Sequence, residues 1–371
     1  MIVRVLIPLL KRYLNLAKRF SASYFEWDEN KGKIVLRDVK HHGKVKAWLL
    51  LHIVYVVLQT LLICFGEFDL VEKSSAGMIL GLYILCLILR FETYIDLVPM
   101  ELNNRSISQN YDAFGREVSE RIPAKFEMAI KHLCNFFGLS CILDPLFIAI
   151  LIVFIPCRTP LLGPMLICNQ KMVSTISTLV VALIEYIIAC SIFMGTFQYS
   201  AFSLVTGILI LHTECKSFFL DRRLNSVEKW LRNYRELQVL EKILNSALRE
   251  RILPAIILVL PVSQILSCLV FVILLKDSKV ISSAMFFIFY LECLGVTMLI
   301  LSFAANMFVK TGKWVSQLSP GQSKTHRRIV KSLQPVKVQF GNNFVDALTP
   351  LVFQQFCATQ TASLLVLKYK L

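Results

Sequence analysis

The chain has 371 residues, of which 56% are hydrophobic and only 18% charged, and its formal net charge is +15. Soluble globular domains contain roughly 45–50% apolar and about 25% charged residues. The excess of apolar residues falls in blocks of about 20 residues or more, the length that crosses a bilayer as a helix. This composition excludes a soluble enzyme and predicts an all-α membrane protein.

Chemistry-bearing motifs are missing from the sequence. The 11 Cys form no CxxC pair and the six His do not cluster, so we expect no metal site and no cofactor. There is also no Ser/His/Asp set and no Gly-rich phosphate loop. The basic residues lie between the apolar blocks, so they indicate membrane topology rather than binding to nucleic acid.

Residues 1–46 form a basic segment ahead of the first apolar block. It begins MIVRVLIPLLKRYLNLAKRF, in which Arg4 and Pro8 interrupt the apolar stretch and no small-residue cleavage site follows. This pattern argues against a signal peptide. We expect either a basic amphipathic helix on the inner membrane surface or a cytosolic helix packed on the bundle.

Seven apolar blocks follow and predict seven transmembrane helices. They span 47–65, 77–98, 136–155, 173–211, 252–275, 280–308 and 347–367. The fourth block has 39 residues, and as one helix it would measure about 58 Å, so we expect it to leave the membrane. Asp346 is a candidate N-cap for the seventh helix, with Pro350 tolerated in its first turn.

The predicted domains follow from these blocks. They are the cytosolic N-terminal segment 1–46, spans 1–4 in 47–211, a cytosolic amphipathic segment in 212–251, spans 5–6 in 252–308, a cytosolic segment in 309–346, and span 7 with the C-terminus in 347–371. In the second cytosolic segment, apolar residues such as Tyr234, Leu237 and Leu244 recur at helical spacing. We expect it to pack on other cytosolic helices or to form a solvated hairpin.

The lysines and arginines predict the orientation. Of the 40 in the chain, 32 lie on the side of the N-terminus and 7 on the other, with Arg90 inside the second span. Because basic residues favour the cytosolic side, the N-terminus is predicted inside and the C-terminus outside. This threading opposes a G-protein-coupled receptor, and the sequence has neither D-R-Y after span 3 nor N-P-x-x-Y in span 7. A secondary transporter is the other alternative, although the seven spans show no obvious halves.

The end of the chain resembles that of arthropod gustatory receptors, in the insect chemoreceptor superfamily. Those receptors end with Thr-Tyr, five hydrophobic residues and Gln-Phe; this chain ends with Thr361-Ala362-Ser363-Leu364-Leu365-Val366-Leu367-Lys368-Tyr369. Ala362 replaces the Tyr and Lys368 replaces the Gln, so the match is that of a divergent member. The segment from Gly341 to Asp346 is similar to the family's entry into its last helix, at the right distance.

This resemblance implies a ligand-gated cation channel of the plasma membrane of sensory neurons, with several spans in each subunit. Members assemble as homo- or heterotetramers in the lipid bilayer, and the seventh helix of each subunit lines the pore. Inner extensions of the helices form a cytosolic anchor region. A small-molecule tastant binds in the outer half of the helix bundle, and no G protein is required.

Residues in span 7 are candidates for the pore and gate. Thr361, Leu364, Leu365 and Lys368 share one helical face, with Tyr369 beside it. If this face lines the pore, Leu364 or Leu365 would form a hydrophobic gate, and otherwise the face is an aliphatic packing stripe. A ring of Lys368 ammonium groups would weaken cation flux, unless the side chain points away from the axis or the carboxylate of Leu371 offsets it.

Ionisable residues inside spans are candidates for ligand contacts because they are costly to bury there. They are Asp144, Glu185 and Glu292, with Tyr186 and Tyr290 beside two of them. Carboxylates and aromatic rings together suit polyols, sugars or amines. The alternative is a carboxylate satisfied by neighbouring polar groups.

Two further features complete the expectations. Arg90, Glu92 and Asp96 are interpreted as structural pairs at the inner boundary. Cys157 and Cys168 fall in one outer loop and could form a disulfide or remain free thiols.

Overall fold

The computed structural model describes most of the chain. The described residues are 2–68, 70–91, 95–112, 124–157, 161–166, 174–199, 204, 206–220, 227–278, 280–317, 328 and 331–370. Within them the α-helices are α1 (Ile2–Arg19), α2 (Val39–Phe65), α3 (Leu70–Arg90), α4 (Val98–Asp112), α5 (Ala124–Phe154), α6 (Leu162–Leu166), α7 (Thr175–Tyr199), α8 (Thr206–Leu220), α9 (Val227–Ala247), α10 (Leu253–Lys276), α11 (Val280–Gln317) and α13 (Thr349–Lys370). A π-helical turn, η3 (Leu248–Ile252), joins α9 to α10. The helical class is confirmed.

Two short antiparallel hairpins accompany the helices, and the composition had not predicted them. Strand β1 (Phe25–Asp28) pairs with β2 (Lys33–Leu36), so that Phe25 lies opposite Leu36. Strand β3 (Gln339–Phe340) pairs with β4 (Asn343–Phe344). The glycines at the two turns, Gly32 and Gly341, have positive φ, which favours glycine there.

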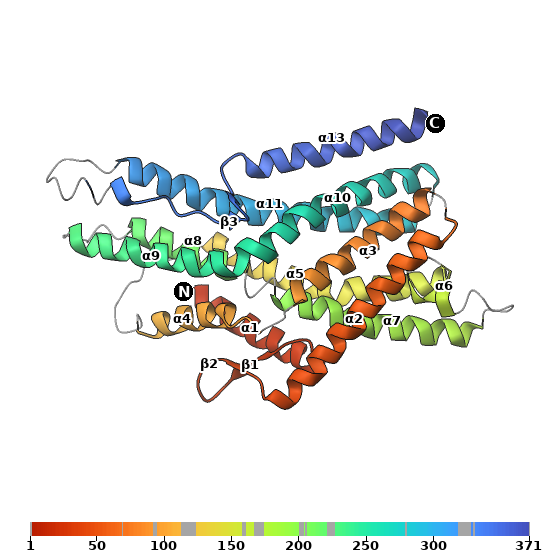
Figure 1. Cartoon of the computed structure of the whole chain (residues 1–371), viewed down its shortest axis with the longest axis horizontal. Helices are drawn as coiled ribbons and strands as arrows, with labels where there is room; N and C mark the ends of the chain where they lie inside the picture. The colour runs from red at the N-terminus through yellow and green to blue at the C-terminus, as the bar shows by residue number, and fades with distance from the viewer. Residues whose placement is uncertain are drawn as a thin grey trace.

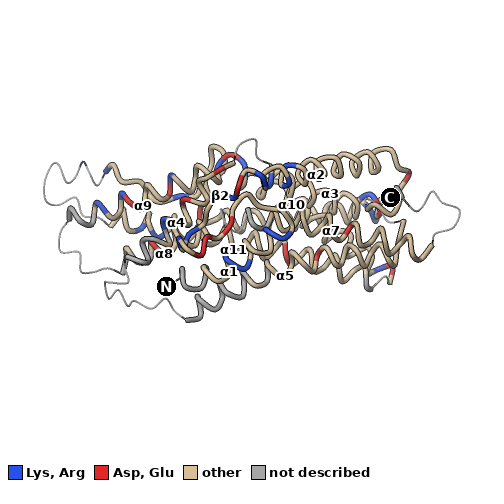
Figure 2. Tube along the Cα trace, turned by 90° about the horizontal axis from the view of Figure 1, so that it is seen from below, with Lys and Arg blue, Asp and Glu red and all other residues tan. Residues whose placement is uncertain are grey.

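The molecule is elongated, with an apolar half and a charged half (Figures 1 and 2). Figure 2 shows most Lys, Arg, Asp and Glu residues in the half that holds α4, α8 and α9. Figure 1 places the C-terminus at the opposite end, beyond α10 and α3. This distribution agrees with a chain that has one membrane half and one aqueous half.

Five helices among the described residues are long and apolar enough to cross a membrane. They lie in Val39–Phe65, Glu72–Arg90, Thr175–Thr196, Leu231–Lys276 and Ser282–Gln317, and a shorter apolar stretch, Gly138–Phe154, lies in α5. These six correspond to six of the seven predicted blocks, and the protein is a multi-span membrane protein. The seventh span, which would be α13, and the direction of threading stay predictions.

Two predicted spans end differently in the structure. The second was expected to reach Val98, but α3 ends at Arg90 and Val98 begins α4. The backbone N–H of Val98 donates to the Asp96 carboxylate at 2.9 Å, and Pro99 stands in the first turn, which together start a new helix. The fourth block contains α7 and the start of α8, which continues to Leu220, and residues 200–203 and 205 between them lie outside the described residues.

Helix α10 is at the centre of the apolar half and packs against α3, α11 and α13. One core, which we call the outer core, lies in the apolar half and includes the buried side chains of Met78, Tyr83 and Phe286. A second core runs into the charged half around Tyr234 and Leu248. The buried side chains therefore form two cores, one in the apolar half and one that extends into the charged half.

Helix α1 packs on the bundle. Its residues Leu10, Leu14 and Ala17 are buried, and the helix contacts α5, α7 and β1. The structure therefore favours a packed helix over one that lies on the membrane surface.

The segment that leads to α13 is extended and held at several points. The Tyr234 hydroxyl donates to the Gln334 carbonyl at 2.7 Å. Asn245 donates to the Lys337 carbonyl and accepts from the Gln339 N–H, both at 2.9 Å. At the end of the segment the Asp346 carboxylate accepts from the Thr349 N–H at 2.8 Å. The segment that leads to α13 is thus fixed to α9.

Candidate functional site

Glu185 lies at the centre of a closed polar cluster in the outer core. Its carboxylate is fully buried on α7 and accepts hydrogen bonds from the hydroxyl groups of Tyr55 on α2 and Tyr83 on α3. The second carboxylate oxygen accepts from the backbone N–H of Leu162, the first residue of α6, at 3.2 Å. One carboxylate therefore connects three helices of the bundle to the short helix α6.

The two tyrosine rings of this cluster also pack on each other. Their centroids lie 5.3 Å apart at an interplanar angle of 81°, an edge-to-face arrangement that aromatic pairs favour. Because both oxygens of Glu185 already accept hydrogen bonds within the protein, the cluster is a structural connection. The structure agrees with the interpretation of Glu185 as an internally satisfied carboxylate.

Asp144, which is buried, and Glu292, which is half-buried, form a second group between α5 and α11. Asp144 is 6% exposed and lies close enough to Glu292 for their charges to interact. The Ser140 hydroxyl donates to Glu292 at 2.9 Å. Within the described residues neither carboxylate forms an ion pair. Buried carboxylates without a counter-charge are costly in a bilayer and favour a cationic or hydroxyl-bearing partner.

The two candidate tyrosines lie apart from this pair. Tyr186 is beside Cys190 on its own helix, α7. Tyr290, on α11, stacks with Phe287 at a centroid distance of 6.5 Å and lies beside Gln264 of α10. The five predicted ligand residues thus form separate groups, and only Asp144 and Glu292 are brought together.

Helix α13 lies at one side of the bundle, against α10 and α11 (Figure 1). Thr361 is only 8% exposed, and its hydroxyl donates to the Cys357 carbonyl one turn earlier. Leu365 and Lys368 follow on this bundle-facing side and are half-buried. Leu364 is 37% exposed at its edge, whereas the side chain of Tyr369 lies outside the described residues. This position of Lys368 favours the alternative in which its ammonium group points away from the exposed face of α13.

The exposed side of α13 carries polar residues among apolar ones such as Val352. Gln355, Thr359 and Ser363 recur every four residues along it, followed by Val366, and all four are exposed. No helix of the described chain covers this face. We call these four residues the outward stripe.

A hydrogen-bonded chain connects α13 to two other helices, and the sequence reasoning had missed it. The Gln264 side-chain amide on α10 donates to the Gln354 carbonyl oxygen at 2.7 Å. The Gln354 amide in turn donates to the Thr297 hydroxyl on α11 at 3.2 Å. An amide at position 264, within a block of apolar residues, was the sequence signal that could have identified this contact.

Three other predicted features can be placed. Cys157 is disulfide-bonded, whereas Cys168 lies outside the described residues. Arg90 is buried and donates to the backbone carbonyl of Ser191 at 3.3 Å, rather than to a carboxylate. Glu92 lies outside the described residues. Among the residues that the structure describes, no group of three or more His, Cys, Asp and Glu could hold a metal ion.

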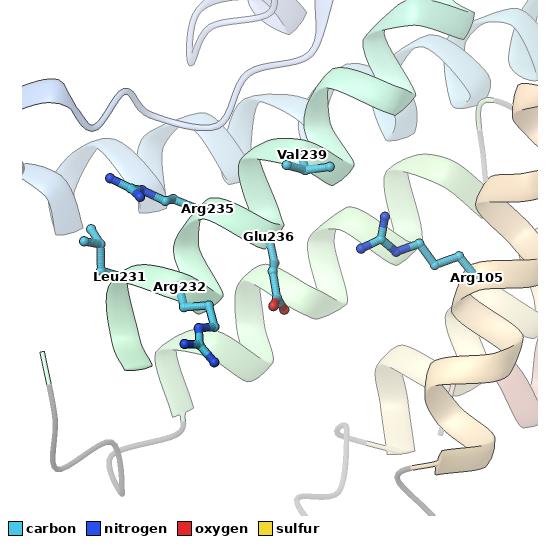
Figure 3. A pocket seen from close by; sticks show the side chains of 6 residues that line it. All are labelled: Arg105, Leu231, Arg232, Arg235, Glu236 and Val239. Carbon is cyan, nitrogen blue, oxygen red and sulfur yellow. The ribbon is translucent and has the colours of Figure 1, made fainter. Parts of the chain in front are cut away.

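A basic pocket of about 450 Å³ lies in the charged half, between α4 and α9 (Figure 3). Its lining residues are Arg105, Leu231, Arg232, Arg235, Glu236 and Val239. Figure 3 shows Glu236 pointing from α9 toward the paler green helix α8, while Arg235 points away from it. The charged side chains do not converge on one point, so the pocket is not a focused binding site.

Comparison with known proteins identifies the fold. The structure is similar to that of the insect olfactory receptor OR5 from Machilis hrabei, with a TM-score of 0.58 over 98% of this chain and 99% of that chain. The sequences are 11% identical, so the likeness concerns the fold. No known family profile and no curated protein sequence matches the chain.

Proposed function

We propose that the protein is a subunit of a chemosensory, ligand-gated cation channel in which α13 lines the pore. The observation that carries this proposal is the outward stripe of α13. A helix of 22 residues is about 33 Å long and can cross a bilayer core. Polar residues on a face that the chain leaves uncovered suit a water-filled path rather than lipid.

The fold supports the same proposal. The insect olfactory receptor OR5 shares this fold over nearly the full length of both chains. The gustatory type rests on the resemblance of residues 361–369 and of the segment before α13. We propose a taste-type receptor that assembles as a homo- or heterotetramer in the plasma membrane of sensory neurons and opens without a G protein.

The Asp144–Glu292 pair is the proposed ligand contact within the bundle. An ammonium group would supply the positive charge that the described surroundings of the pair lack, and Ser140 would add a hydroxyl contact. An amine is therefore the proposed tastant class, with polyols and sugars as the alternative. Tyr290 is proposed as an adjoining aromatic contact, whereas Glu185 and Tyr186 have no proposed role in binding.

Recording current from cells that express the chain tests this function. We expect amines from a panel of amines, sugars and bitter compounds to evoke an inward cation current. The current should persist when the pipette contains a G-protein inhibitor. A current that the inhibitor abolishes would instead support a G-protein-coupled receptor.

A secondary transporter is the second candidate, and the carboxylate pair is the observation that favours it. Paired carboxylates inside a bundle also serve as proton or cation sites in transporters. Uptake of a labelled amine without any channel current would support the transporter and contradict the channel.

A further inference from the structure

The contact between Gln354 and its two partners has an unusual position in the bundle. Gln354 is in the second turn of α13, and its carbonyl and amide groups face different helices. Gln264 contributes from α10 and Thr297 from α11. Among the described residues, these are the only side-chain hydrogen bonds that join α13 to another helix. The hydroxyl groups of Thr361 and Ser363 donate hydrogen bonds to backbone carbonyls of α13 itself.

The remainder of the α13 surface adds little that is specific. Cys357 is buried against the bundle, but most of the neighbouring side chains of α13 are exposed. Apolar contacts of this kind allow a helix to slide or tilt, because lipid replaces them at little cost. The glutamine contact is directional, and so it fixes one position of α13 relative to α10 and α11.

The contact is also close to a proposed ligand residue. Gln264 is 2% exposed, and its carbonyl oxygen has no hydrogen-bond partner. Tyr290 of α11 lies beside it. A movement of the Tyr290 ring can therefore change the environment of the amide that holds Gln354.

We propose that Gln264 and Gln354 are positioning residues that hold α13 in the position it has in the closed channel when no ligand is bound. Release of their contact then favours opening of the channel. This inference rests on the proposed channel function. It adds a path from Tyr290, through one side-chain amide, to the helix of the outward stripe. Neither glutamine needs to contact the ligand or the ions.

Exchange of each glutamine for methionine tests the proposal, because methionine keeps the length and volume of the side chain and removes the amide. The variants are Gln354→Met, Gln264→Met and the double variant. Gln59→Met is the matched control, because Gln59 on α2 is buried as Gln264 is, and it lies beside Tyr55 rather than beside α13. Ligand-free open probability is measured in membrane patches, and amide hydrogen exchange of α13 is measured on the purified full chain.

We expect Gln264→Met, which removes one hydrogen bond of ordinary strength, to raise ligand-free opening about fivefold, and Gln354→Met, which removes two, to raise it at least as much. Amide exchange in α13 should accelerate by a similar factor. The double variant should change both quantities no more than the stronger single variant, because both substitutions remove the same contact. Gln59→Met should leave both unchanged. A merely structural role would lower expression without this non-additive pattern.

The outcomes separate this inference from the proposed function. Unchanged exchange in α13, or a fall in ligand-free opening, overturns the inference even if the chain conducts. If the wild-type chain passes no current at all, the proposed function fails. The exchange measurement then decides the inference alone, with faster exchange in both single variants supporting it and unchanged exchange overturning it.

Discussion

The carboxylate of Glu185 on α7 accepts a hydrogen bond from the Tyr83 hydroxyl on α3 at 3.3 Å, in a site that no solvent reaches. Tyr55 donates to the same oxygen, and the Leu162 N–H donates to the other. The cluster therefore connects the outer parts of α2, α3 and α7 to α6. It is a connection between helices rather than a vacant binding site.

Removal of the Glu185 carboxylate should destabilise the protein strongly. In Glu185→Leu, the two tyrosine hydroxyls and the Leu162 N–H lose a buried acceptor, and we expect a loss of about 3 kcal/mol. Glu185→Gln keeps one acceptor oxygen and should lose less than half of that. Thermal unfolding of the protein purified in detergent measures both variants. Equal stability of Glu185→Leu and the wild type would show that the cluster contributes nothing.

Neutralisation of the acid pair should weaken activation by an amine. We expect Asp144→Asn and Glu292→Gln each to raise the half-activating concentration about tenfold, because each removes a charge-assisted contact. Thr196→Val is the control, since the Thr196 hydroxyl is buried between α7 and α3 and donates to the Cys86 carbonyl. Dose–response currents provide the measurement. An unchanged half-activating concentration in both acid variants would remove the pair from the ligand site.

Charge on the outward stripe should change cation conductance. If Ser363 faces the pore, Ser363→Lys places a ring of positive charge in the ion path and should lower single-channel cation conductance severalfold. Ser363→Asp should raise it. Lys368→Gln should raise it only slightly, because Lys368 lies on the bundle-facing side of α13. Conductance that responds to Lys368 and ignores Ser363 would assign the pore to the other face.

The start of α13 should depend on pH through Asp346. Hydrogen bonds from the Thr349 hydroxyl, and then from the backbone N–H groups of Thr349 and Leu348, hold the pKa of Asp346 below its ordinary value of 3.8. A carboxylate with a lowered folded-state pKa stabilises the fold above pH 3.8, and this contribution is lost as the pH falls through the lowered value.

The substitution that tests this capping role is Asp346→Ala. We expect it to destabilise the protein by about 1 kcal/mol at pH 7, because the first turn of α13 loses its cap. The difference from the wild type should shrink as the pH falls below 3.8 and through the lowered pKa of Asp346, because the wild-type carboxylate then becomes protonated. Melting temperatures of both proteins across this range provide the test, and a difference independent of pH would contradict the role of the charge.

The elements that the sequence predicted well are those with a strong period or a long apolar run. The apolar block at 252–275 corresponds to α10 (Leu253–Lys276). The helical spacing of apolar residues around Tyr234 correctly predicted α9. The N-cap role of Asp346 was also predictable, because a carboxylate ahead of a helical block has one common use. These features are local, so neighbouring residues determine them.

The elements that the sequence predicted poorly depend on distant partners. The break after Arg90 is an exception, because it depends on the local cap at Asp96 and was missed although its signal lies nearby. The partners of Glu185 come from positions more than 20 residues away along the chain, and those of Gln354 lie 57 and 90 residues away. The side of α13 that faces the bundle likewise depends on α10 and α11, so periodicity alone could not separate Thr361 from the outward stripe.

The most direct test of the central claim is single-channel recording from the purified chain in a planar lipid bilayer, with no other protein present. The account predicts discrete cation-selective openings whose probability rises with an activating amine and whose conductance falls in Ser363→Lys. Openings that are unaffected by Ser363→Lys, or a bilayer that stays silent while reconstituted vesicles accumulate the amine, would contradict it.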